Sequence, residues 1–174
     1  MRQHINFDHG GSMANSMPTK KKFSIKECET EEAMLQFKHF SNYDALSVGK
    51  MLINASLIRQ VNPAFEIVIN GFTVFRFAFP LTNRLNDIWL KKKCNTVNTV
   101  HMSSLHLGLL LQSNNEELEK DWGLTSTEYA TIGGGFPIII KNTGVIGSVC
   151  ASGLAHEEDH QLVVDTLKQY LECC

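Results

Sequence analysis

The residues best suited to chemistry lie near the end of the chain, in the run His156-Glu157-Glu158-Asp159-His160. This run has the H-E-x-x-H spacing that, in zinc proteases, places two histidine ligands and a carboxylate base on one face of a helix. Ser152-Gly153 closely precedes it, so the run forms the first turn of a helix, where the three acids complement the helix dipole. His160 continues the apolar stripe of that helix, and no third ligand follows it in the sequence, which leaves His101 and His106 as the ligands that the fold could bring near. We therefore predict a partly buried structural histidine and no metal site.

Three consecutive glycines, Gly133-Gly134-Gly135, form a second candidate site, because they can expose successive backbone N–H groups to an anion. Phosphate-binding loops of the Walker or dinucleotide type open a helix. Here Phe136-Pro137 and another strand follow instead, which indicates a bend or bulge where a neighbouring group approaches closely. The sequence leaves open whether that neighbour is a ligand or another part of the protein.

Candidate nucleophiles lack the partners that catalysis requires. Ser103-Ser104 lies between His101 and His106, but no carboxylate is close to it in the sequence. Neither G-x-S-x-G nor a cysteine-protease signature is present. We therefore predict no catalytic residue.

Apolar residues repeat with the period of a helix in some segments and with the period of a strand in others. These segments are the elements that position the candidate residues. Asn70-Gly71 tolerates the positive φ of a type I′ turn and is the strongest hairpin signal, and Asn142-Thr143-Gly144 marks a second turn. Two hairpins separated by a helix, with helices at both ends, predict an α+β domain whose helices cover an antiparallel sheet. The expected elements are helices over 27–38 and 45–61, strands over 65–69 and 73–79, a long helix over 83–112, a loop or short helix over 113–123, two strands flanking 142–144 and a helix from 156.

Some apolar faces are wider than a single core contact requires. In the helix over 45–61, Leu46 and Leu57 belong to a second apolar stripe beside the first, so we expect that helix to be buried on two sides. In the strand over 73–79, Phe77 is one of three phenylalanines on one face and is expected to pack into the core. Packing within the subunit or against a second subunit satisfies these patterns, and we predict a homo-oligomer.

Composition bounds the class of protein. The 174 residues, 43% of them hydrophobic, are enough for one substantial core and too few for two ordinary domains. Residues 1–22 are polar, so we expect a disordered tail or an expression remnant there and a single domain over 23–174. A formal charge of -2 does not favour nucleic acid or a membrane surface as a partner. No apolar run approaches the roughly 18 residues of a membrane span. The five cysteines include no C-x-x-C pair, so we expect reduced thiols, with Cys94 and Cys150 in the core. The cytoplasm is the expected location.

Several short motifs occur in a fixed order: Asp44-Ala45-Leu46, Asn86 with Trp89, Lys91-Lys92-Lys93, Ser103-Ser104, Gly133-Gly134-Gly135-Phe136-Pro137-Ile138, Ile146-Gly147, and Ser152-Gly153-Leu154 with Asp159-His160. Together they resemble the haem-degrading domain family (GlcG/HbpS-like), and most closely its branch of small bacterial and fungal cytosolic proteins. The resemblance covers about residues 37–171. It implies a profilin-like α/β/α sandwich with a five-stranded antiparallel sheet, usually assembled into multimers. Some family members bind haem or related tetrapyrroles, and others have no known ligand.

We predict a cytoplasmic homo-oligomer that binds a small ligand or a protein partner and has no catalytic residues. One alternative is haem or tetrapyrrole binding, with or without haem degradation, in which His101, His106, His156 or His160 supplies the axial ligand. A second alternative is an oligomeric adaptor in protein traffic. The predicted ligand-binding residues, which follow the motifs of the family, are Asn86, Trp89, Lys93, Ser103, Ser104, Gly133, Gly134, Gly135, Phe136 and His160.

Overall fold

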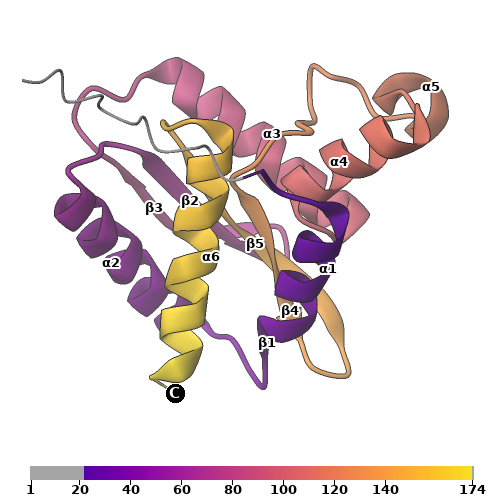
Figure 1. Ribbon diagram of the computed structural model, residues 1–174. Coiled ribbons are helices and arrows are strands. Elements are labelled where there is room, and N and C mark those ends of the chain that lie inside the picture. Colours follow the sequence, from indigo (N-terminus) through magenta and orange to yellow (C-terminus); the bar gives the residue numbers. More distant parts are fainter. Residues whose placement is uncertain (1–21, 174) are drawn as a thin grey trace, which may run out of the picture.

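The computed structural model describes residues 22–173, and its centre is a five-stranded sheet (Figure 1). The strands are β1 (Gln36–Phe37), β2 (Ala64–Ile69), β3 (Phe72–Ala78), β4 (Gly135–Ile140) and β5 (Gly144–Ser152). They lie in the order β1-β4-β5-β2-β3. β2 pairs antiparallel with both β3 and β5, and β4 pairs antiparallel with β5, whereas β1 is parallel to β4.

The predicted α+β class and the five strands are confirmed, but the prediction of a purely antiparallel sheet is wrong. β1 is the exception, because Gln36 lies beside Ile139 in a parallel pair. The Lys141 N–H donates to the Phe37 carbonyl oxygen at 2.9 Å, so this short segment covers the edge of β4 that would otherwise be unpaired. A two-residue strand shows no alternation of polar and apolar residues, and the sequence placed it in the preceding helix.

Both predicted hairpins are present. Asn70 and Gly71 have φ values of 49° and 78°, as a tight turn between β2 and β3 requires. Asn142 and Gly144 also have positive φ, at 62° and 115°, and they turn the chain from β4 into β5. These turn residues therefore set the registers of the two hairpins.

Helices cover both faces of the sheet (Figure 1). One face carries α2 (Asn42–Arg59) and α6 (His156–Glu172), which also pack against each other, and the other face carries α3 (Arg84–Val100). The remaining helices are α1 (Ile25–Met34), which packs on α4 (Ser104–Asn114), and the short α5 (Leu118–Trp122). No helix over residues 22–173 is long and apolar enough to cross a membrane. Except for Lys22, the predicted tail at 1–22 lies outside the described residues.

The main core lies between the sheet and the α2–α6 pair, and a smaller cluster lies under α3. Phe65, Ile67 and Phe136 are fully buried in the main core. Cys94 and Cys150 are buried in the smaller cluster as free thiols, which confirms that they act as core hydrophobes.

Two apolar faces are less buried than expected within one subunit. Leu57 is 60% exposed and Leu46 is 42% exposed, because α2 meets the sheet and α6 while its second stripe faces outward. Phe77 is 36% exposed since β3 is an edge strand. Phe75 on the same strand does reach the core, where its ring packs so closely on α2 that a Cβ on Gly49 would lie 2.5 Å from it.

The single helix predicted over 83–112 is wrong, because the chain forms α3 and α4 with a break between them. His101 ends α3 in the left-handed conformation, with φ 60°. Ser103 begins α4, and its Oγ accepts a hydrogen bond from the His106 N–H at 3.2 Å. Both helices bury apolar residues, so the apolar pattern continues through the break and conceals it.

Candidate functional site

The predicted glycine site is filled by other parts of the protein. A Cβ on Gly133 would lie 2.2 Å from the His156 carbonyl oxygen, at the start of α6. Gly134 has φ +115°, and a Cβ there would lie 2.6 Å from both the Lys93 Nζ and the Ala151 carbonyl oxygen. Only glycine allows these groups to approach so closely. The neighbour that the sequence left open is therefore protein.

Lys93 and Asp159 form a buried ion pair beside these glycines. The Lys93 Nζ donates to the Asp159 Oδ2 at 2.9 Å and to the Ala151 carbonyl oxygen at 2.8 Å. The Asp159 Oδ1 accepts from the Leu154 N–H at 3.1 Å. Burial raises the pKa of the Asp159 carboxyl above its ordinary value, and the Lys93 ammonium opposes that rise. The pair joins α3 to the start of α6, so the charge of Lys93 is compensated inside the protein.

Ser103 and Ser104 hold the junction between α4 and the glycine segment. Ser103 caps α4 through the bond from the His106 N–H. The Ser104 Oγ donates to the Ile132 carbonyl oxygen at 2.6 Å and accepts from the Gly135 N–H at 3.0 Å. Both serines are fully buried, so their hydroxyls act in structural hydrogen bonds.

Asn86 and Trp89 lie apart from this cluster, half-buried in the first turns of α3. The Asn86 Oδ1 accepts from the Asn83 N–H at 2.9 Å and completes the capping box of α3. The Lys92 Nζ lies 5.0 Å from the centroid of the Trp89 ring, which is a cation–π contact. The Asn86 Nδ2 also donates to the Ser152 carbonyl oxygen at 3.5 Å, so Asn86 links the start of α3 to β5, whereas Trp89 contacts a lysine at the helix surface.

His160 faces α1, an element that sequence reasoning did not connect with the site. Its Nε2 lies 3.0 Å from the Glu31 Oε2, and both side chains are buried. The next residue, Glu32, accepts from the Ser103 N–H at 2.8 Å and lies 3.1 Å from the His106 Nδ1. The hydrogen bond to Glu32 raises the pKa of His106, while burial acts in the opposite direction. Two adjacent acids of α1 thus hold α4 and α6.

Eight of the ten predicted site residues, all except Asn86 and Trp89, therefore form a packed joint between α3, α4, α6 and β4. Phe136 is fully buried, with its ring centroid 6.0 Å from that of His160. None of the ten predicted residues lines any of the four grooves described for residues 22–173. Their role in ligand binding stays a prediction, and the contacts observed are internal.

The four histidines considered as axial ligands lie in different environments. His106 and His160 are buried beside carboxylates. His101 is exposed at the end of α3, and the His156 Nε2 lies 3.4 Å from the Oε1 of the adjacent Glu157. None of the four lines one of those grooves.

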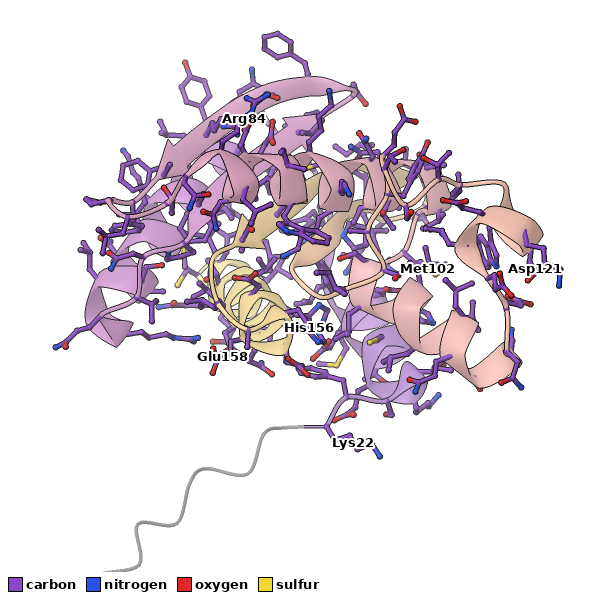
Figure 2. All side chains as sticks on the ribbon, turned by 90° about the horizontal axis from the view of Figure 1, so that it is seen from above. Lys22, Arg84, Met102, Asp121, His156 and Glu158 are labelled. Atoms are coloured by element: carbon purple, nitrogen blue, oxygen red, sulfur yellow. The ribbon has the colours of Figure 1, made fainter. Side chains whose placement is uncertain are left out.

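The largest of the four described grooves lies between α3 and the β2–β3 hairpin. Its volume of about 700 Å³ is in the range of small-molecule sites. Arg76 of β3 pairs with Asp87 of α3 and lies 3.7 Å from Glu66 of β2, while Arg84 lies 2.7 Å from the same Asp87. Figure 2 shows Arg84 well away from His156, which begins α6. The groove is polar, and several of its charges pair with one another.

A second groove, of about 430 Å³, lies beside β1 and the end of α6. Met34 and His39 line it, and both are residue types that ligate haem iron. Lys38 and Lys141 also line it and can pair with carboxylates. The Tyr170 hydroxyl on its wall donates a hydrogen bond to Asp44. Burial raises the pKa of that carboxyl, but hydrogen bonds from Ser41 and Tyr170 outweigh burial and lower the pKa below its ordinary value. Its lining comes from distant segments, so no local motif predicted it.

Comparisons of the sequence with a family model and with curated proteins point to the same group of relatives. A family model described as haem degrading protein HbpS-like matches residues 40–168. A UPF0303 protein of Yersinia enterocolitica is 35% identical over 147 residues, which cover 84% of this chain and 88% of that protein. A UPF0303 protein of Yersinia pseudotuberculosis is 35% identical over 144 residues, which cover 83% and 84% of the two chains.

Solved structures share the fold. The Ybr137w protein has a TM-score of 0.79 at 26% identity, covering 87% of this chain and 90% of that one. The PduOC:haem complex has a TM-score of 0.64 at 19% identity, with 75% and 94% of the chains covered, and HbpS has 0.60 at 14%, with 78% and 92% covered. Because the family model spans most of the sequence and the UPF0303 proteins match over most of their length, the chain belongs to the HbpS-like haem-degrading protein family.

Proposed function

We propose that this chain is a cytoplasmic homo-oligomeric binding protein whose copies assemble through the end of the subunit that carries α2 and β3. The observation that supports this is the distribution of exposed apolar side chains. Residues 22–173 expose ten large hydrophobic side chains, and only Met34 lies away from α2, β3 and the segment 81–88. The other nine lie on α2, on the edge strand β3 and in the segment 81–88, and we call this set the α2–β3 face: Tyr43, Leu46, Leu57, Ile58, Phe72, Phe77, Leu81, Leu85 and Ile88.

The α2–β3 face also contains a free strand edge. Among the described strands β3 pairs only with β2, so one edge of its seven residues is unpaired (Figure 1). A free edge beside exposed aromatic side chains is a template for pairing with another chain. Ile58 is 83% exposed and Phe72 is 70% exposed, and a second copy of the chain that covers both accounts for these exposures.

Sedimentation velocity at micromolar concentration tests the assembly. We expect the wild-type protein to sediment as an oligomer and the Ile58→Asp and Phe72→Asp variants to sediment as monomers, because a buried unpaired charge opposes association. Met34→Asp is the matched control, since Met34 is 65% exposed but lies on α1. A monomeric wild-type protein, or dissociation caused equally by all three variants, would contradict the proposal.

Tetrapyrrole binding in the groove beside β1 is the second candidate function. The specific observation in its favour is that His39 and Met34 line one groove of about 430 Å³ together with Lys38 and Lys141. Two lysines suit the two carboxylates of a haem, and histidine suits its iron. The PduOC:haem complex, which shares this fold, supports the same class of ligand.

A haemin titration followed by absorbance tests this candidate. We expect a Soret shift with the wild-type protein that is lost in His39→Ala and kept in His101→Ala, because His101 is exposed outside the described grooves. An unchanged spectrum on addition of wild-type protein, or an equal shift with His39→Ala, rules this groove out as the haem site.

A further inference from the structure

Three side chains that ligate metals converge between α1 and α6. A Cys28 sulfur, a Glu31 carboxylate oxygen and a His160 ring nitrogen all lie within 4.8 Å of one another, and all three residues are buried. Cys28 and Glu31 are three positions apart on α1, so they project from the same side of that helix. His160 is 129 positions from Glu31 in the sequence, and only the fold brings it to them.

We propose that Cys28, Glu31 and His160 form a binding site for a thiophilic divalent cation of the Zn²⁺ type. Thiolate, carboxylate and imidazole are the ligands that zinc takes in proteins, and tetrahedral bond lengths place such ligands about 3.4–3.6 Å apart. The His160 Nε2 lies 3.0 Å from the Glu31 Oε2, and no ligand pair exceeds 4.8 Å. Shifts of a few tenths of an ångström to about 1 Å suffice to place the donors around one ion.

The charges of the three side chains match a divalent cation. A thiolate and a carboxylate carry two negative charges, and a neutral imidazole adds none, so a 2+ ion neutralises the set. Phe23 and Phe136 surround the imidazole, with ring centroids 5.2 Å and 6.0 Å from that of His160. In such an apolar shell an uncompensated charge is costly, so a set of ligands whose charge balances that of the ion is favoured.

The two ring nitrogens of His160 have different surroundings. Its Nδ1 is buried and has no hydrogen-bond partner among the described residues, although buried polar atoms usually have one. The contact with Glu31 engages only the other ring nitrogen. The Nε2 is therefore the nitrogen that faces Glu31, and the proposed site rests on the convergence of the three side chains.

A groove of about 240 Å³ leads to the cluster. Glu31 lines it together with Lys26, Met34 and Lys168. The Lys168 Nζ lies 3.9 Å from the Glu31 Oε1 and offsets part of the carboxylate charge. Three protein ligands leave one coordination position for water or a small ligand, as in open zinc sites.

Metal binding at this site releases a proton. Burial, followed by the charges of Glu31, Glu32 and Glu27, raises the pKa of the Cys28 thiol to about 12, while a hydrogen bond from Ser103 lowers it. The metal-free thiol is therefore protonated at neutral pH and must lose its proton to become a ligand.

Cobalt titration of the full-length, reduced and chelator-treated protein tests the proposal. Cys173→Ser/Cys174→Ser serves as the background, because the adjacent terminal cysteines are themselves a metal ligand pair. We expect one Co²⁺ per chain, with a thiolate-to-cobalt charge-transfer band that Zn²⁺ abolishes by displacing the cobalt. Cys28→Ser should remove the band, Glu31→Gln and His160→Gln should weaken binding by more than about tenfold, and the control Cys94→Ser should keep it.

Thermal unfolding provides a second measurement for variants that bind weakly. Zn²⁺ should raise the unfolding midpoint of the background protein and of Cys94→Ser, but not that of Cys28→Ser, whose fold is checked by circular dichroism. The proposal is overturned if the background protein shows no charge-transfer band, or if the band persists in Cys28→Ser. The cation site and oligomer assembly fail independently, because no residue of the α2–β3 face belongs to the site.

Discussion

Replacing Lys93 with methionine should destabilise the protein strongly at neutral pH and much less in acid. Methionine keeps most of the buried stem but removes both hydrogen bonds of the ammonium, to Asp159 and to the Ala151 carbonyl. Asp159 is then left buried with backbone N–H groups, those of Leu154 and Gly153, as its remaining partners. Removing one member of a buried ion pair costs about 3–5 kcal/mol.

Protonation of Asp159 limits this cost and makes it depend on pH. Neutralising a carboxyl of ordinary pKa 3.8 costs about 1.4 kcal/mol per pH unit, hence about 4 kcal/mol at pH 7 and about 2 kcal/mol at pH 5. The sign follows from linkage: a carboxyl whose folded pKa is raised binds more protons when folded, so folding stability falls as pH rises from 3.8 through the folded pKa. Loss of Lys93 removes an effect that lowers this pKa, so the penalty grows towards neutral pH.

Urea unfolding at pH 5 and pH 7, at fixed protein concentration, measures this effect. Lys91→Met is the control, because Lys91 is an exposed lysine on the same helix and should change stability by no more than about 0.5 kcal/mol. Lys93→Met/Asp159→Asn should recover part of the loss at pH 7, since the amide oxygen still accepts from Leu154. A penalty below about 1 kcal/mol, or one that is equal at both pH values, would refute the reasoning.

Two further predictions concern the joint between the helices. Gly71→Ala should lower the free energy of unfolding by about 1–2 kcal/mol through its positive φ alone, since nothing lies within 4 Å of an added Cβ there. Gly134→Ala should lower it by about 1–3 kcal/mol more, because its Cβ also meets Lys93 and Ala151. Equal unfolding midpoints for the two variants would contradict this. Glu32→Gln should lose stability mainly in acid, because Glu32 raises the pKa of His106 above the ordinary 6.5. A raised histidine pKa stabilises the fold at pH values below 6.5, and this contribution disappears as pH rises through the folded pKa. Urea unfolding of wild type and Glu32→Gln at pH 5.5 and 8.5 checks the sign, and a larger difference at pH 8.5 would oppose it.

Features with short-range signals were predictable from the sequence. Asn70-Gly71 and the turn at 142–144 fix two hairpins through their own φ values. The three acids that open α6, Glu157, Glu158 and Asp159, mark its first turn. The same pattern placed His160 on the buried side of α6, as observed.

Features that depend on tertiary contacts were not predictable. Lys93 lies in a lysine run that suggests a solvated face, and its partner Asp159 is 66 residues away. The break at His101 is concealed because both flanking helices have an apolar stripe, which continues through the break. For α1, the available signal was an acid pair at Glu31-Glu32 one turn after Cys28, a spacing that also fits an ordinary surface helix.

Amide hydrogen exchange of β3 tests assembly through the α2–β3 face most directly. The β3 amides that do not pair with β2 are open in a single subunit and covered when a second copy adds to that edge. We predict that these amides are protected at micromolar concentration, and that protection is lost on dilution and in Ile58→Asp. Rapid exchange of the outer β3 amides in the wild-type protein, unchanged across concentrations, would contradict the proposed assembly.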